Sequence, residues 1–145
     1  MLVKTFGNTI SLLNTANVEL LECGIITGYH EWHSRSLNIC SPFSRLYFVE
    51  NGEGYLLSQN NRIKMQPGNV YLAPAYFNFG FSCPNNIDKL YFHFNFKMKN
   101  GRDIFDGYND FICNSVSLER IKLYKKLMQS AKYTDIMSFK YLIAK

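Results

Sequence analysis

Residues of the kinds that hold metals are scarce in this sequence. Its 145 residues include three histidines and four widely separated cysteines, with no Cys-x-x-Cys pair and no histidine at zinc-ligand spacing from a cysteine. Structural zinc sites draw their ligands from such closely spaced pairs, so neither a zinc site nor a redox thiol pair is indicated. We expect free thiols in a reducing cytoplasm. They are Cys23, Cys40, Cys83 and Cys113.

Long apolar runs are absent as well. No stretch of the chain stays apolar over the roughly 20 residues that a membrane-spanning helix needs. Residues 1–17 lack the basic start, continuous apolar segment and small-residue cleavage site of a secretory signal. The sequence therefore predicts a cytoplasmic protein without a membrane partner.

Catalytic motifs are also missing. The sequence shows no recognisable combination of Ser or Cys with His and an acid, no glycine-rich phosphate loop before a helix, and no close pair of carboxylates in its strand-rich part. Glu31, Glu50 and Glu53 are better explained as charges in loops and at strand ends. We therefore expect a protein that is not an enzyme and uses no cofactor.

The composition favours one folded domain. Hydrophobic residues make up 47% of the chain and aromatic residues 16%, which suits a core rich in rings and excludes disorder as the main state. The net charge of +5 arises largely after Ser117, where lysines fall at helical spacing opposite an apolar stripe. A solvated helix face explains this excess better than a DNA-contacting patch.

Closely spaced turns dominate the region from Arg45 to Phe96. Asn51-Gly52 and Gly54 supply the positive φ of tight hairpins, and Pro67-Gly68 suits the centre of a type II turn. Short aromatic and β-branched runs between such turns are typical of an all-β barrel or sandwich. We expect a meander of antiparallel strands over 18–29, 44–50, 54–58, 62–65, 70–73, 76–83 and 88–98, with a short strand at 110–114.

The two ends of the chain differ from this pattern. The sequence predicts an N-terminal arm over residues 1–17, the β-barrel over 18–116 and a helical segment over 117–145. Ser117 and Thr134 can each cap a helix, and the second helix ends while still apolar, so we expect the natural protein to continue. The first helix carries more apolar residues than one barrel flank requires, which predicts a homodimer. The dimerising residues would be Leu118, Ile121, Tyr124 and Leu127.

Segment 88–98 alternates clearly between apolar and polar residues. Leu90, Phe92, Phe94 and Phe96 share one face, which must be buried. The other face either meets solvent or lines a cavity for a small polar ligand, because rings stack and their tips form hydrogen bonds. Segment 76–83 repeats the alternation. A cavity would be lined by Asn78, Lys89, Tyr91 and His93; the other outcome is a lumen filled by Phe43, Phe48, Phe77, Phe79 and Phe81.

Three separated motifs occur together in the strand-rich region. They are Leu46-Tyr47-Phe48-Val49-x-x-Gly52-x-Gly54-Tyr55, Met65-Gln66-Pro67-Gly68-Asn69-Val70-Tyr71-Leu72-Ala73-Pro74 and Leu90-Tyr91-Phe92-His93-Phe94. In order and spacing, the sequence resembles the N-terminal cupin domain of AraC-type transcription regulators over residues 35–96 and, more loosely, over the C-terminal helices. The resemblance implies a mainly β fold, a cupin-type jelly-roll β-barrel followed by two C-terminal α-helices.

The resemblance also implies a function. Such a domain binds a small effector, often a sugar, in the barrel and dimerises through its helices. Arg35 lies where the resembling domains often have an arginine, and a guanidinium suits sugar hydroxyls or a carboxylate. DNA would be bound only by a C-terminal pair of helix-turn-helix units that this chain does not contain.

Cupin enzymes set the competing interpretation. Their metal is held by a His-x-His pair, a Glu and a later His, whereas this sequence has no His-x-His and carries Asn78 at the later position. We therefore expect no metal, including at His30 and His33. The alternative to a regulator is a stand-alone, metal-free cupin enzyme such as a sugar isomerase or epimerase.

Overall fold

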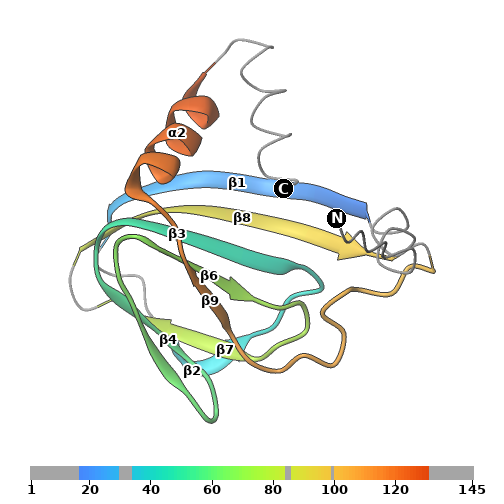
Figure 1. The fold of residues 1–145 in the computed structure, drawn as a ribbon. Helices are drawn as coiled ribbons and strands as arrows, with labels where there is room; N and C mark the ends of the chain where they lie inside the picture. The colour runs from blue at the N-terminus through green and yellow to red at the C-terminus, as the bar shows by residue number, and fades with distance from the viewer. Residues whose placement is uncertain (1–16, 30–33, 84–85, 99, 131–145) are drawn as a thin grey trace, which may run out of the picture.

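Two antiparallel β-sheets face each other in the computed structural model, which describes residues 17–29, 34–83, 86–98 and 100–130 (Figure 1). One sheet has five strands in the order β1-β8-β3-β6-β9, and the other has four in the order β2-β7-β4-β5. The strands are β1 (Asn17–Tyr29), β2 (Ser34–Ile39), β3 (Ser44–Gly52), β4 (Gly54–Leu57), β5 (Arg62–Met65), β6 (Asn69–Ala73), β7 (Phe79–Ser82), β8 (Ile87–Lys97) and β9 (Ile112–Ser115).

The order of the strands corrects the predicted meander. From β1 to β8, successive strands lie in opposite sheets, except for the β4–β5 hairpin. The turn at Gly68, with φ of 81°, carries the chain from β5 across to β6 in the other sheet instead of back alongside β5. This alternation is the order of a two-sheet jelly roll. The predicted closed barrel is wrong, because no ladder joins the two sheets among the described residues.

The space between the sheets is largely filled by aromatic rings. Phe111 meets Phe77 edge-on at 4.9 Å and Phe79 at 5.8 Å between ring centroids, a favoured geometry for buried rings. Phe77 and Phe79 thus fill part of the lumen, as one of the sequence-based alternatives had it, whereas Phe48, expected among them, faces a separate core. The buried residues of this inner core are Tyr47, Val49, Leu56, Met65, Tyr71, Ala73, Phe77, Phe79, Cys83, Ile87 and Phe111.

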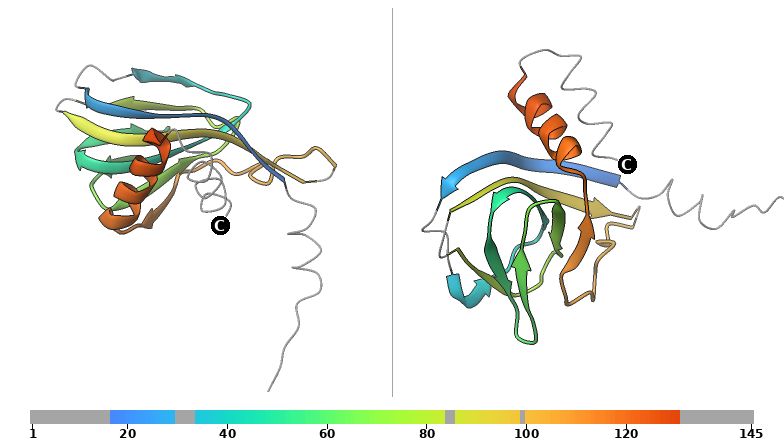
Figure 2. Two further views of the ribbon diagram at one scale, coloured as in Figure 1. Left: turned by 90° about the horizontal axis from the view of Figure 1, so that it is seen from above. Right: turned by 60° about the vertical axis from the view of Figure 1, so that its left-hand side comes forward.

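A second core lies between the five-stranded sheet and α2 (Leu118–Gln129) (Figure 2). The hydroxyl of Ser117 accepts a hydrogen bond from the backbone N–H of Arg120 and so caps the helix, as predicted. Phe48 meets the ring of Tyr124 edge-on at 5.3 Å, and Ile121 is fully buried. The buried residues of this outer core are Phe48, Leu90, Phe92, Ile121 and Tyr124.

Several expectations about the helices and strands need correction. The described residues contain one helix rather than two, and the helix expected from Thr134 lies outside them. None of the helical structure described is long and apolar enough to cross a membrane. Strand β2 was not predicted, and β7 begins at Phe79 instead of 76 because Tyr76 adopts a turn conformation with φ of 61°.

Candidate functional site

Three neighbouring strands of the five-stranded sheet bring polar side chains together on its inner face. In the register of the sheet, Arg45 of β3 lies opposite His93 of β8, and Tyr47 lies opposite Tyr91. On the other side of β8, Glu22 of β1 lies opposite His93. Because alternate residues of a strand share a face, these side chains converge with Lys89. They line a cavity of about 350 Å³, the β8 pocket, formed by Glu22, Gly24, Ile25, Ile26, Arg45, Tyr47, Lys89, Tyr91 and His93.

Glu22 connects the two titratable rings of β8. Its Oε1 accepts a hydrogen bond of 2.9 Å from the hydroxyl of Tyr91, and its Oε2 lies 3.4 Å from Nδ1 of His93. The hydrogen bond to Glu22 raises the pKa of Tyr91, which keeps the phenol protonated. Burial, helped by the charge of Arg45, lowers the pKa of His93. The carboxylate therefore fixes both rings in orientation while the imidazole favours its neutral form.

Lys89 is the most deeply buried of the ionisable groups in the pocket. The residue is 1% exposed, and its Nζ lies 4.3 Å from the centroid of the Tyr47 ring. Burial lowers the pKa of Lys89 well below its ordinary value, because removal from water disfavours the ammonium. Burial also raises the pKa of Tyr47. The amine and the phenol beside it both favour their uncharged forms.

Arg45 supplies a fixed positive charge at the pocket wall. Its Nη2 donates a hydrogen bond of 2.8 Å to Oγ of Ser41, and its guanidinium lies 5.2 Å from the Phe43 ring centroid. The Nε of Arg45 is buried and has no hydrogen-bond partner within the described part of the chain. A buried donor without a partner is costly, so a ligand oxygen that accepts from it would gain free energy.

The structure groups some of the predicted ligand-binding residues and separates others. Lys89, Tyr91 and His93 line the same pocket. Asn78 does not join them: it is exposed in the loop before β7 and lines a different cavity, because the chain turns at Tyr76 ahead of the strand. Arg35 belongs to β2, in the opposite sheet, and its side chain lies outside what the structure describes.

The predicted dimerisation residues are also divided. Ile121 and Tyr124 are buried against the chain's own sheet, and Leu127 packs at the edge of the same outer core. Leu118 is 43% exposed. Three of the four side chains that suggested a partner helix therefore pack within one chain.

Sequence reasoning missed Glu22, Arg45 and Tyr47. The sequence did contain a signal for Arg45, because this charged residue directly precedes the apolar run 46–49. Arg45 also lies two positions before Tyr47, so the two side chains share one face of the strand. The sequence contained no signal for Glu22, because its role depends on β1 pairing with β8, and that pairing is not local.

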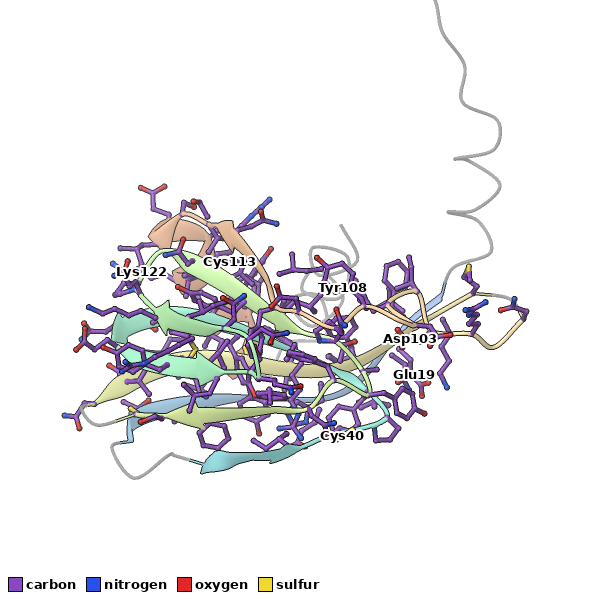
Figure 3. All side chains as sticks on the ribbon, turned by 90° about the horizontal axis from the view of Figure 1, so that it is seen from below. Glu19, Cys40, Asp103, Tyr108, Cys113 and Lys122 are labelled. Carbon is purple, nitrogen blue, oxygen red and sulfur yellow. The ribbon has the colours of Figure 1, made fainter. Side chains whose placement is uncertain are left out.

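The described residues provide no metal centre of the usual kind. No group of three or more His, Cys, Asp or Glu side chains gathers within them. All four cysteines are free thiols, and Figure 3 shows Cys40 and Cys113 on opposite sides of the molecule.

The fold resembles that of ToxT from Vibrio cholerae over most of this chain. The apo structure of a ToxT variant from Vibrio cholerae matches with a TM-score of 0.52 and 11% identity, over 89% of this chain and 52% of that one. ToxT from the same organism with a bound unsaturated fatty acid matches with a TM-score of 0.46 and 11% identity, over 88% of this chain and 50% of that one. Ethanolamine utilization protein Q from Salmonella typhimurium matches with a TM-score of 0.40 and 14% identity, over 54% of this chain and 68% of that one.

The likeness is one of fold, and this chain spans about half the length of the ToxT chains. No family model matches the sequence, and no curated protein does. The chain thus shares the fold of about half of ToxT.

Proposed function

We propose that this chain is the ligand-sensing and dimerisation domain of an AraC-type transcription regulator. It binds a small polar effector, such as a sugar, in the β8 pocket and pairs with a second copy through α2. DNA is bound by a separate C-terminal domain, and the regulator works in the cytoplasm without catalysing a reaction. The fold shared with ToxT supports the regulator class.

The convergence of polar groups in the β8 pocket is the observation that carries the proposal. The Tyr91 ring offers a stacking face, the carboxylate of Glu22 accepts hydrogen bonds, and Nε of Arg45 is a buried donor without a partner among the described residues. A few placed polar groups in an otherwise apolar cavity are typical of small-molecule sites. A neutral polyol or a small carboxylate meets these requirements.

Strand β8 provides the connection between the pocket and the helix. Lys89 and Tyr91 face the pocket, while Leu90 and Phe92, between and beside them, pack in the outer core with Ile121 and Tyr124. A ligand that shifts β8 changes the surface on which α2 rests. If the ligand binds the protein more tightly with α2 in one position than in another, it would bias how two attached DNA-binding domains are presented.

Thermal stability in the presence of candidate effectors tests the proposal. Pentoses, hexoses and small monocarboxylates are added singly to the purified chain, and a binder raises Tm by mass action. For at least one of these compounds the shift should disappear in Tyr91→Ala and persist in Tyr108→Ala, whose side chain lines the other cavity. If Tyr91→Ala abolishes the shift of none of these compounds, the assignment of the pocket is wrong.

An enzyme remains the second candidate, on one specific observation. Glu22 contacts both a phenol and an imidazole, and such a trio can pass a proton between a bound substrate and a side chain. A metal-free sugar isomerase or epimerase would need this chemistry. Turnover of an aldose that is lost in Glu22→Gln would favour the enzyme, whereas binding without turnover favours the sensor.

A further inference from the structure

A second cavity lies away from the β8 pocket, among three connecting segments. It measures about 820 Å³ and is bounded by the β4–β5 turn, the β6–β7 loop and the β8–β9 loop. Sites for small molecules commonly occupy roughly 300–1,000 Å³. Its lining shares no residue with the β8 pocket. The residues that line it include Gln59, Asn60, Tyr76, Asn78, Tyr108 and Asn109.

The lining of this loop cavity is polar but almost uncharged. Four of its side chains are amides, each of which both donates and accepts hydrogen bonds. Apart from the tyrosines, Asp106 is its one ionisable side chain, and Oδ2 of Asp106 lies 2.6 Å from Nε of Arg102 in an ion pair. The cavity lining contains no Lys, Arg or His to hold a carboxylate or phosphate. A neutral ligand rich in hydroxyl groups fits this chemistry.

Tyr76 is held in a strained conformation at the edge of the cavity. Its φ of 61° makes it the one non-glycine residue with positive φ in the part of the chain that the structure describes. The backbone is fixed there by a 2.8 Å hydrogen bond from the N–H of Tyr76 to the carbonyl of Ser41. A 3.1 Å bond from the N–H of Ala75 to the hydroxyl of Ser44, which is fully buried, adds to it.

The strain presents an aromatic ring to solvent. Tyr76 is 66% exposed although Ala75 and Phe77 on either side are buried. Glycine would adopt this backbone without cost, and strained residues of this kind cluster at ligand sites. Packing gives no reason for a tyrosine here, so binding is the better explanation.

Tyr108 provides a second exposed ring from the opposite loop (Figure 3). It is 48% exposed and follows Gly107, whose φ of 81° turns the loop. The amide of Asn61 contacts both carboxylate oxygens of Asp110, at 3.2 and 3.3 Å, and so ties the β4–β5 hairpin to this loop. The wall that carries Gln59 and Asn60 is therefore fixed relative to the wall that carries Tyr108.

We propose that the loop cavity is a second ligand site, which binds a neutral saccharide. The apolar face of a sugar ring stacks on Tyr76 or Tyr108, and the hydroxyl groups pair with the amides of Gln59, Asn60, Asn78 and Asn109. Amides match hydroxyls in both directions of hydrogen bonding, which carboxylates and ammonium groups do not. This site does not depend on the function proposed for the β8 pocket.

Titration calorimetry with defined sugars tests the site. Glucose, galactose, mannose, maltose and cellobiose are compared with glucuronate and glucose 6-phosphate on the purified chain. At least one neutral sugar should bind saturably and the charged ones should not. Tyr108→Ala should weaken the binding of that sugar about tenfold, as expected for loss of a stacking ring, whereas it should not affect a sugar held only in the β8 pocket. Failure of every neutral sugar, or neutral-sugar binding that Tyr108→Ala never weakens, overturns the proposal.

Tyr76→Asn separates binding from folding. Asparagine tolerates the left-handed region better than tyrosine, so the variant should keep or raise Tm while the affinity for the sugar falls. If Tyr76 served only the fold, Tm would fall and the affinity of the folded fraction would not. That result, with Tyr108→Ala also binding as wild type, would exclude the site.

Discussion

The ring of Tyr91 lies directly over the backbone of Gly24 on the neighbouring strand. A Cβ at Gly24 would stand 2.5 Å from Cε1 of Tyr91 and 2.6 Å from its hydroxyl oxygen, closer than real contacts allow. The absence of a side chain therefore permits the ring position from which Tyr91 donates to Glu22. Gly24 determines the shape of the β8 pocket without offering a functional group of its own.

Gly24→Ala should act through Tyr91. The added methyl pushes the ring aside and breaks the hydrogen bond to Glu22, so we expect the variant to be less stable to urea than the wild type. In a Tyr91→Ala background the same substitution meets no ring, and the two changes should couple by about 1 kcal/mol. Equal destabilisation in both backgrounds would show that the ring and the glycine do not interact.

Phe92→Ala and Tyr91→Ala should differ in their cost. Phe92 is 1% exposed in the outer core, where it meets Phe48 edge-on, and buried Phe→Ala changes cost roughly 3–5 kcal/mol. Tyr91 is only partly buried at the pocket, so its truncation should reduce the free energy of unfolding less. Urea unfolding of the two variants measures the difference. The reverse order would mean that the β8 pocket is part of the stabilising core.

Lys89→Met should raise stability at neutral pH. Because the folded pKa of Lys89 lies well below 10.5, the unfolded chain binds more protons at pH values between the two. Stability contributed by the neutral amine is thus greatest above the unfolded pKa and is lost as pH falls. The wild type should become less stable from about pH 9 to about pH 7, and Lys89→Met should lack this slope. Urea unfolding across that window checks it.

That window avoids the rings with shifted pKa values around the amine. His93, with its lowered pKa, titrates below the window, while Tyr47 and Tyr91, with raised pKa values, titrate above it. If the stability of Lys89→Met depends on pH as that of the wild type does, a group other than Lys89 takes up the proton. The titratable or charged groups facing the amine are Glu22, Arg45, Tyr47, Cys83, Tyr91 and His93.

Leu118→Glu tests the proposed homodimer. Leu118 is exposed at the start of α2, so a charge there should leave the fold intact and weaken association by placing a carboxylate in an apolar interface. Sedimentation should show a dimer for the wild type at tens of micromolar and a monomer for the variant. A wild-type monomer at about that concentration counts against dimerisation through α2. Lys126→Glu, at an exposed position of the same helix away from the apolar stripe, is the matched control.

Addition of zinc, manganese or iron should leave Tm unchanged. A metal that binds the folded chain would raise Tm by mass action, and the described residues offer no cluster of three ligands. Purification without a histidine tag, followed by elemental analysis, provides the second measurement. Stoichiometric metal would overturn this prediction.

Local features of the fold could be predicted from the sequence because they depend on neighbouring residues. The turn at Pro67-Gly68, the alternation of Leu90 and Phe92 with Lys89 and Tyr91, and the cap at Ser117 each follow from residues close in the chain. The assignment of strands to two sheets could not be predicted in this way. Whether a turn returns the chain to its own sheet or sends it across depends on packing between distant residues.

The candidate site divides along the same line. Lys89, Tyr91 and His93 are alternate residues of one strand, so the sequence alone predicts that their side chains share a face. Asn78 shares a sequence pattern with them, but the positive φ of Tyr76 removes it from the strand and places it in the loop cavity. Glu22 and Arg45 enter the pocket through pairing across strands, which no local pattern encodes.

The pairing of β1 with β8 also sets when the pocket can exist during folding. The hydrogen bond from Tyr91 to Glu22 spans 69 positions of the chain, and Asn17 pairs with Lys97 in the same ladder. Contacts so distant in sequence close large loops and slow folding. A growing chain has no β8 pocket until it has been synthesised at least as far as His93 and β8 has paired with β1. Ligand can therefore stabilise the finished domain, and it cannot template the early steps of its folding.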